Sequence, residues 1–142
     1  MIQQLRVFLD SNVVFSAARD PRSDLQLLWS IPEVDILLSE FVLKEVKAHL
    51  VHPDQRASLW GLLYRSHLVP DPDPFPLPEF TNLPEKDIPI LLAAIGSKAD
   101  ILVTGDRRHF GHLFGQSMLG VHIESTTMFK NRYPQFFRRE LK

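Results

Sequence analysis

Two aspartates follow short apolar runs that predict buried strands. Asp10 comes directly after Leu5–Leu9, and Asp106 comes shortly after Ile101–Val103. Strands that alternate with helices are typical of parallel sheets, in which all carboxyl ends share one edge. Two carboxylates that meet there repel each other unless a cation neutralises them, and Mg²⁺ and Mn²⁺ take oxygen ligands. The pair therefore predicts a divalent-metal site, although each aspartate has an alternative interpretation as the N-cap of the following helix.

Glu45 lies on a predicted helix that begins after Ser39 and ends near Leu50. At about 100° per residue, this glutamate falls beside Val42 and Val46, at the border of the face that the helix buries. A carboxylate at such a border needs a partner. The alternative is a border glutamate whose tip reaches water.

Asp87 precedes the apolar run Ile88–Ile95 and shares a helical stripe with Leu91. It is a fourth candidate for the site. An acid at the start of a helix is also favoured by the helix dipole and by capping, which is the alternative interpretation. Glu85 and Glu40 are competing candidates for the same group of ligands.

Other chemistries find little support. The chain has no cysteine, which excludes disulfides, thiolate metal sites and a cysteine nucleophile. His109 and His112 are three residues apart, as are His49 and His52, but neither pair has the glutamate and spacing of a zinc-protease motif. A histidine metal site is therefore not predicted, and His49 is interpreted as a core or border residue. No G-x-S-x-G motif is present.

Five apolar runs predict the strands, and helical segments separate them. These runs are Leu5–Leu9, Val34–Leu38, His67–Val69, Ile101–Val103 and Val121–Ile123. The pattern predicts an α/β fold, a three-layer α/β/α sandwich with a central, mostly parallel sheet. Residues 70–84 hold six of the eleven prolines and predict an extended connection. With 142 residues, we expect one domain over residues 1–142.

The charge pattern limits how the chain can bind nucleic acid. Its net charge is −1, so attraction to phosphates has to come from a local patch. Arg107 and Arg108 are candidates for RNA contacts, with a solvated surface as the alternative. The predicted helical tail over residues 126–142 is basic, and its aromatic side chains favour packing on the core over base stacking. No run approaches the roughly 20 apolar residues that span a bilayer, and the N-terminal apolar run is too short for a signal peptide. We expect a cytoplasmic protein with no membrane partner.

Three segments together resemble one known family. They are FLDSNVVFSAA (residues 8–18), SEFVLKEV (residues 39–46) and EKDIPILLAAIGSKADILVTGD (residues 85–106). Their order and content are similar to the PIN-domain family of metal-dependent ribonucleases, over roughly residues 5–125. The resemblance implies that a metal is held by Asp10, Glu45, Asp87 and Asp106. It also implies supporting roles for Asn12, which would orient Asp10 or a water, and Thr104, which would hydrogen-bond a carboxylate or the attacking water.

The same resemblance implies a function. It indicates an endoribonuclease that uses Mg²⁺ or Mn²⁺ to hydrolyse RNA and leaves a 5′-phosphate. Within the family, the chain is similar to the toxins of toxin–antitoxin pairs, which implies a homodimer and a small antitoxin partner. An RNA-processing PIN nuclease and a non-cleaving, metal-dependent RNA-binding or scaffold module are the alternatives. A metal-dependent phosphatase of another α/β fold is a further one.

Overall fold

A computed structural model describes residues 3–78 and 81–137 of the chain. The strands, in chain order, are β1 (Leu5–Leu9), β2 (Val34–Ser39), β3 (His67–Val69), β4 (Ile101–Thr104), β5 (Ser117–Met118) and β6 (Val121–Ser125). The α-helices are α1 (Ser11–Arg19), α2 (Glu40–His49), α3 (Pro53–Tyr64), α4 (Ile88–Gly96), α5 (Arg107–Phe110), α6 (Thr126–Lys130) and α7 (Pro134–Phe137). Short 3-10 helices are η1 (Asp24–Ser30), η3 (Glu85–Asp87) and η4 (Gly111–Leu113).

The strands form one six-stranded sheet in the order β3-β2-β1-β4-β6-β5. All neighbouring strands are parallel except β5 and β6, which are antiparallel. Phe8 of β1 lies opposite Leu37 of β2 on one side and Leu102 of β4 on the other. The chain leaves β1 for β2 in one direction and later places β4 on the other side of β1. The strand order therefore reverses between β1 and β4, which is where ligands bind in open α/β sheets.

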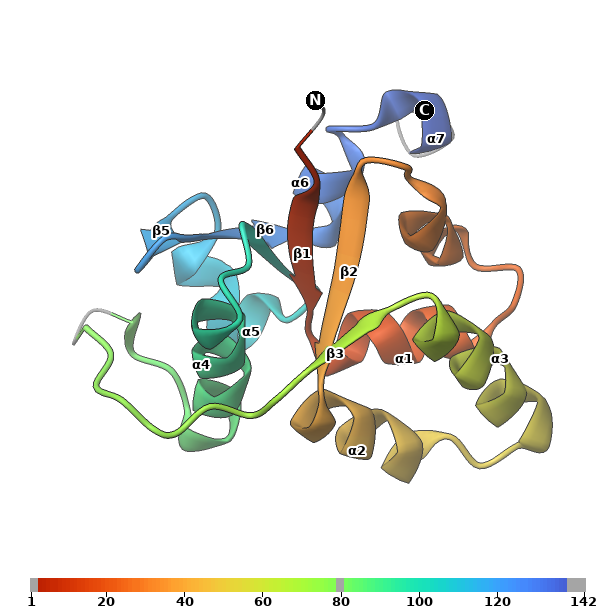
Figure 1. Ribbon diagram of the computed structural model, residues 1–142, viewed down its shortest axis with the longest axis horizontal. Coiled ribbons are helices and arrows are strands. Elements are labelled where there is room, and N and C mark those ends of the chain that lie inside the picture. The colour runs from red at the N-terminus through yellow and green to blue at the C-terminus, as the bar shows by residue number, and fades with distance from the viewer. Residues whose placement is uncertain (1–2, 79–80, 138–142) are drawn as a thin grey trace.

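Helices cover both faces of this sheet. Figure 1 shows α1 and α3 on one side of the central strands β1 and β2, and α4 with α5 on the other. Because both faces are covered, the central strands carry continuous apolar runs instead of alternating ones. Val7, Phe8 and Leu9 of β1 are each fully buried, as are Leu102 and Val103 of β4. The predicted three-layer α/β/α sandwich with a mostly parallel sheet is confirmed.

Local signals in the sequence explain where the helices begin. Ser39 accepts a hydrogen bond from the Val42 amide and caps α2, as its position predicts. Pro53 lies in the first turn of α3 and Pro89 in the first turn of α4, where a missing amide proton costs no helical hydrogen bond. Asp10 and Asp106 are the N-caps of α1 and α5.

All five predicted strands are present. The short elements after Asp106, namely α5, η4 and the two-residue strand β5, are absent from the prediction because such short segments have no measurable periodicity. Residues 70–78 form an extended connection, as predicted, and residues 79–80 of that segment lie outside the described residues. In the tail, α6 and α7 are helical and separated by a turn, and residues 138–142 lie outside the described part. No helix among the described residues has the length and apolar character needed to span a membrane.

Candidate metal centre

Two of the four acids predicted to bind metal lie at the carboxyl ends of β1 and β4. Asp10 is the first residue after β1, and Asp106 is the second residue after β4. Glu45 comes from α2, and Asp87 ends η3 just before α4 begins. All four side chains line one cavity of about 410 Å³. The site therefore forms where the strand order reverses.

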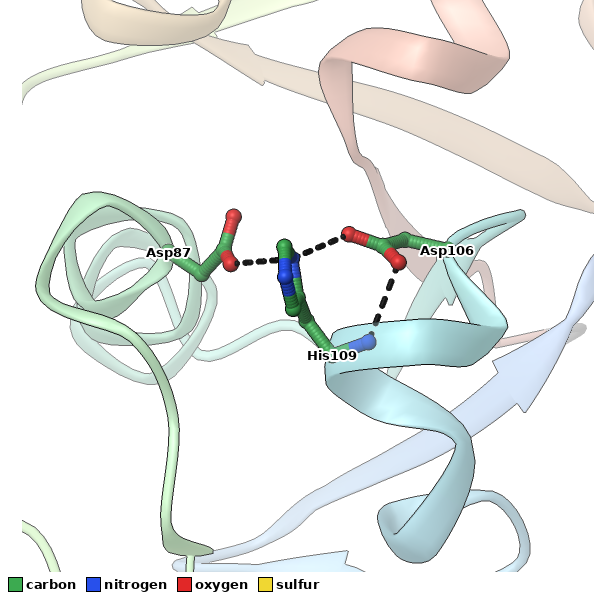
Figure 2. A group of neighbouring side chains, drawn as sticks. All are labelled: Asp87, Asp106 and His109. Atoms are coloured by element: carbon green, nitrogen blue, oxygen red, sulfur yellow. Dashed lines mark hydrogen bonds and ion pairs between the residues drawn. The ribbon is translucent and has the colours of Figure 1, made fainter.

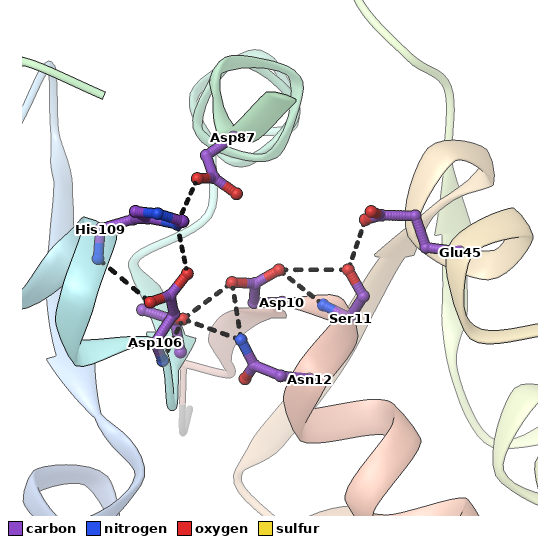
Figure 3. Close-up of polar contacts among 8 residues, drawn as sticks. Asp10, Ser11, Asn12, Glu45, Asp87, Asp106 and His109 are labelled. Carbon is purple, nitrogen blue, oxygen red and sulfur yellow. Dashed lines mark hydrogen bonds and ion pairs between the residues drawn. The ribbon is translucent and has the colours of Figure 1, made fainter. Parts of the chain in front are cut away.

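Asp10 is the most buried of these acids, with 4% of its surface exposed. Its Oδ1 accepts from the Ser11 amide at 2.7 Å, and its Oδ2 accepts from Asn12 Nδ2 at 3.2 Å (Figure 3). The same Oδ2 accepts from Thr104 Oγ1 at 2.7 Å. Burial raises the pKa of Asp10, although the hydrogen bonds from Thr104 and Ser11 oppose that rise. Nearby Asp87 raises this pKa further. The hydrogen bonds thus hold the carboxylate in a buried position, where its charged form is poorly solvated.

Thr104 and Asn12 connect the carboxyl ends of β1 and β4 by hydrogen bonds. Thr104 is fully buried, and its hydroxyl donates to Asp10 while it accepts from the Asp106 amide at 3.1 Å. Asn12 Oδ1 accepts from the Gly105 amide at 2.9 Å. A Cβ at position 105 would lie 3.2 Å from this same Oδ1, which explains why glycine stands there. The supporting positions predicted for Thr104 and Asn12 therefore agree with their contacts around Asp10.

Glu45 is half-buried and has a partner that the sequence did not suggest. Its Oε1 accepts from Ser11 Oγ at 2.5 Å. Ser11 Oγ also lies 3.3 Å from Asp10 Oδ1, so one serine connects Asp10 and Glu45 (Figure 3). The border position predicted for Glu45 is correct, and its tip is turned toward the site.

Asp87 and Asp106 converge on one histidine. His109 Nδ1 lies 2.9 Å from Asp87 Oδ2 and 2.9 Å from Asp106 Oδ2, and Figure 2 shows the ring between the two carboxylates. Asp106 Oδ1 accepts from the His109 amide at 3.0 Å and so caps α5. Asp87 makes no capping hydrogen bond, which contradicts the capping interpretation for this residue. Burial raises the pKa of Asp87 against the opposing charges of His109 and Lys86.

The donor atoms fit a divalent cation. Asp87 Oδ2 and His109 Nδ1 are both shielded from solvent, and within the described part of the chain neither makes a hydrogen bond of acceptable geometry, in spite of their 2.9 Å separation. Two buried polar atoms left without directed partners are costly. One ligand atom each from Asp87, Asp106 and His109 also lies within 4.8 Å of the other two. A cation would satisfy all of these atoms, and carboxylate-rich sites suit Mg²⁺ and Mn²⁺.

Comparisons with known proteins identify the fold. No protein-family model matches the sequence, and no curated protein is significantly similar to it. Solved structures do match. VapBC2 from Rickettsia felis, bound to a DNA fragment from its promoter, has a TM-score of 0.58 and 16% identity, and the match covers 85% of this chain and 98% of that chain. DNA-bound VapBC from Salmonella typhimurium has a TM-score of 0.56 and 17% identity, with 86% and 98% covered. The chain has a PIN fold. At this level of identity, the likeness concerns the fold alone.

The cavity of this PIN fold includes some of the predicted residues and not others. The side chains that line it are Asp10, Ser11, Asn12, Phe15, Glu45, Val46, His49, Lys86, Asp87 and Asp106. Glu40 and Glu85 are exposed and not among them, and Arg107 and Arg108 are exposed next to Asp106. A larger hollow of about 570 Å³ lies elsewhere, beside η1 and α7. One carboxylate and two arginines line it among the described residues, so it lacks the convergence of acids that marks the candidate site.

Three further residues of the PIN fold depart from the prediction or are absent from it. His49 was expected in the core or at its border, but it is exposed. Its ring lies edge-on to the ring of Phe15, with the two ring centroids 6.2 Å apart. Ser11 and His109 were not predicted at the site. Ser11 has a detectable signal, because it is a hydroxyl residue next to Asp10. His109 was considered only as a partner of His112, whose Nε2 instead contacts the Thr81 carbonyl oxygen at 2.6 Å.

Proposed function

We propose that this protein is a divalent-metal-dependent endoribonuclease and the toxin of a toxin–antitoxin pair. The observation that carries the proposal is the convergence of Asp10, Glu45, Asp87 and Asp106 on one cavity at the reversal point of a PIN fold. Four carboxylates in one cavity are unfavourable unless a cation neutralises them. Burial raises the pKa values of Asp10 and Asp87, and the neighbouring acids add to the rise.

Mg²⁺ or Mn²⁺ held by these four acids would activate a water and neutralise the charge that develops on the leaving oxygen of a phosphodiester. The other residues keep the acids in place. Thr104 and Asn12 orient Asp10, and Ser11 orients Glu45. Because a metal-activated water would be the attacking group, no serine nucleophile is needed. In-line attack by water, which leaves a 5′-phosphate, fits this set of side chains.

Apolar and aromatic side chains at the cavity support an RNA substrate with unpaired bases. Phe15, Val46 and His49 line the cavity together with the acids. An aromatic surface next to a phosphate-cleaving centre suits a base that is stacked out of a single strand. Lys86 at the same cavity, with exposed Arg107 and Arg108 nearby, would contact phosphates. This local arrangement would offset the overall charge of −1.

The toxin assignment rests on the fold comparison. The solved structures that match are VapBC complexes, and 98% of each matching chain is covered. We therefore propose a small antitoxin protein as partner and a homodimer as the working form. Induced expression in a bacterial host should arrest growth, while Asp106→Asn should not. Co-expression of a short reading frame next to this gene should restore the growth of cells that express the wild-type protein.

The decisive experiment measures cleavage of a labelled single-stranded RNA pool in EDTA, Mg²⁺ or Mn²⁺. It compares wild type with Asp10→Asn and Asp106→Asn, and with Asp54→Asn as a matched control, since Asp54 is an exposed acid on α3. We expect metal-dependent cutting by wild type and the control, and a loss of orders of magnitude in the two site variants. Equal cutting by all four proteins would show contamination and refute the assignment. RNA binding without cutting, by folded protein with bound metal, would favour the non-cleaving module.

A further inference from the structure

His109 is a side chain at the candidate centre that is not an acid and whose ring nitrogen faces two of its carboxylates. Its Nδ1 lies 2.9 Å from an oxygen of Asp87 and 2.9 Å from an oxygen of Asp106 (Figure 2). The side chain is 22% exposed, and Nδ1 itself is shielded from solvent. This differs from a histidine on the solvated surface, whose ring nitrogens contact water and not two carboxylates.

These separations match those between ligands of one metal ion. An octahedral ion about 2.1 Å from each ligand holds adjacent ligands about 3.0 Å apart. A directed hydrogen bond would also give 2.9 Å, but neither Nδ1 nor Asp87 Oδ2 makes one of acceptable geometry with the described residues. The nitrogen and the oxygen therefore have the spacing of two ligands but not the direction of a hydrogen bond, as expected if they share a cation.

The backbone fixes the ring in this position. His109 lies on α5, whose first turn is capped by Asp106 through the His109 amide at 3.0 Å. Asp106 therefore uses Oδ1 to hold the histidine backbone and Oδ2 to face the histidine ring. This coupling sets the ring relative to Asp106 before any ion binds, which is the usual condition for a well-formed metal site.

We propose that His109 Nδ1 is a metal ligand beside Asp87 and Asp106, and that it biases the centre toward first-row transition ions over Mg²⁺. This inference rests on the proposed function in so far as that function needs a metal at this centre. Mg²⁺ prefers oxygen ligands and keeps its waters, whereas imidazole is a good ligand for transition ions. Mn²⁺, which accepts both oxygen and nitrogen, is the suitable probe.

The test is pulsed electron paramagnetic resonance of Mn²⁺ bound to the full chain. A coordinated imidazole gives nitrogen modulation of the Mn²⁺ signal, and labelling of histidine with ¹⁵N changes that modulation. We expect the modulation in wild type and its loss in His109→Gln. His112→Gln is the matched control, because its amide can still donate to the Thr81 carbonyl oxygen. The labelled wild type tests the proposal even if His109→Gln does not fold.

Binding measured by calorimetry gives a second result. In His109→Gln, the Mn²⁺ dissociation constant should rise at least about tenfold, and the Mg²⁺ constant should rise less. Mn²⁺ bound without nitrogen modulation in the wild type would overturn the proposal and leave the nuclease intact, with His109 as a counter-ion to the acids. Absence of binding by any divalent ion would overturn this inference and the proposed function together.

Discussion

Replacement of Thr104 by valine tests how the centre is held together. The side chain is fully buried and close to valine in shape, so Thr104→Val removes a hydroxyl without leaving a cavity. The loss includes a 2.7 Å hydrogen bond to the Asp10 carboxylate and a 3.1 Å bond from the Asp106 amide. A bond to a charged group contributes about 1.5–3 kcal/mol and a neutral one about 0.5–1.5 kcal/mol. We expect the free energy of unfolding to fall by about 2–4 kcal/mol.

This loss should depend on pH in a defined direction. Burial raises the pKa of Asp10, and the Thr104 hydroxyl opposes that rise, so its removal raises this pKa further. An acid whose pKa is higher in the folded than in the unfolded state destabilises the fold while it is ionised. The extra cost of Thr104→Val is therefore present above the pKa of Asp10, and it shrinks as the pH falls through that value.

Urea unfolding in EDTA, followed by circular dichroism from neutral to acid pH, measures both effects. Thr104→Ser is the matched control, because it keeps the hydroxyl and loses only a methyl group. The serine variant should cost about 1 kcal/mol at every pH. If the valine and serine variants lose stability in parallel across the pH range, the hydrogen bond to Asp10 does not hold the carboxylate as argued.

Three further predictions concern single side chains. In metal-free protein, Asp87→Asn should raise the melting temperature at neutral pH and not at low pH, because burial raises the pKa of Asp87 and its ionised form destabilises the fold. An unchanged or lower melting temperature at neutral pH would contradict this. Arg132→Ala should cost about 2–3 kcal/mol in urea unfolding, since Glu124, whose side chain is 5% exposed, loses its arginine partner and keeps the weaker contact with His122 at 3.3 Å. Glu124→Gln in the same chain should recover part of the loss. Phe15→Ala should weaken single-stranded RNA binding about 5- to 150-fold, while Mn²⁺ affinity stays unchanged; loss of both would assign Phe15 a structural role.

Much of the fold was predictable because its strands are buried on both faces. Continuous apolar runs such as Val7–Leu9 and Ile101–Val103 have few alternative interpretations when helical segments separate them. Caps and prolines then set the helix starts, as at Ser39 and Pro89. The pairing of β5 with β6 was not predictable, because two residues carry no period and the antiparallel edge depends on a tight turn.

The candidate site was predictable only where the fold rule fixed a position. Asp10 and Asp106 follow strands on either side of the reversal point, so their convergence follows from topology. Glu45 was placed by its helix face. His109 depends instead on a four-residue helix whose capping by Asp106 turns the ring toward Asp87, a residue 22 positions away in the chain. No local pattern encodes that contact.

The capping and metal-binding interpretations of the two aspartates turn out to be compatible. Asp10 uses Oδ1 to accept from the first amide of α1, and Asp106 uses Oδ1 to accept from the His109 amide. In each case Oδ2 is directed elsewhere, toward Thr104 in one and toward the His109 ring in the other. One oxygen of each acid thus anchors the side chain to a helix end, and that anchoring holds the carboxylates together in spite of their repulsion. The folded protein already holds these carboxylates close together without a metal. A bound cation would therefore reduce the repulsion between them, and it would not have to bring its ligands together.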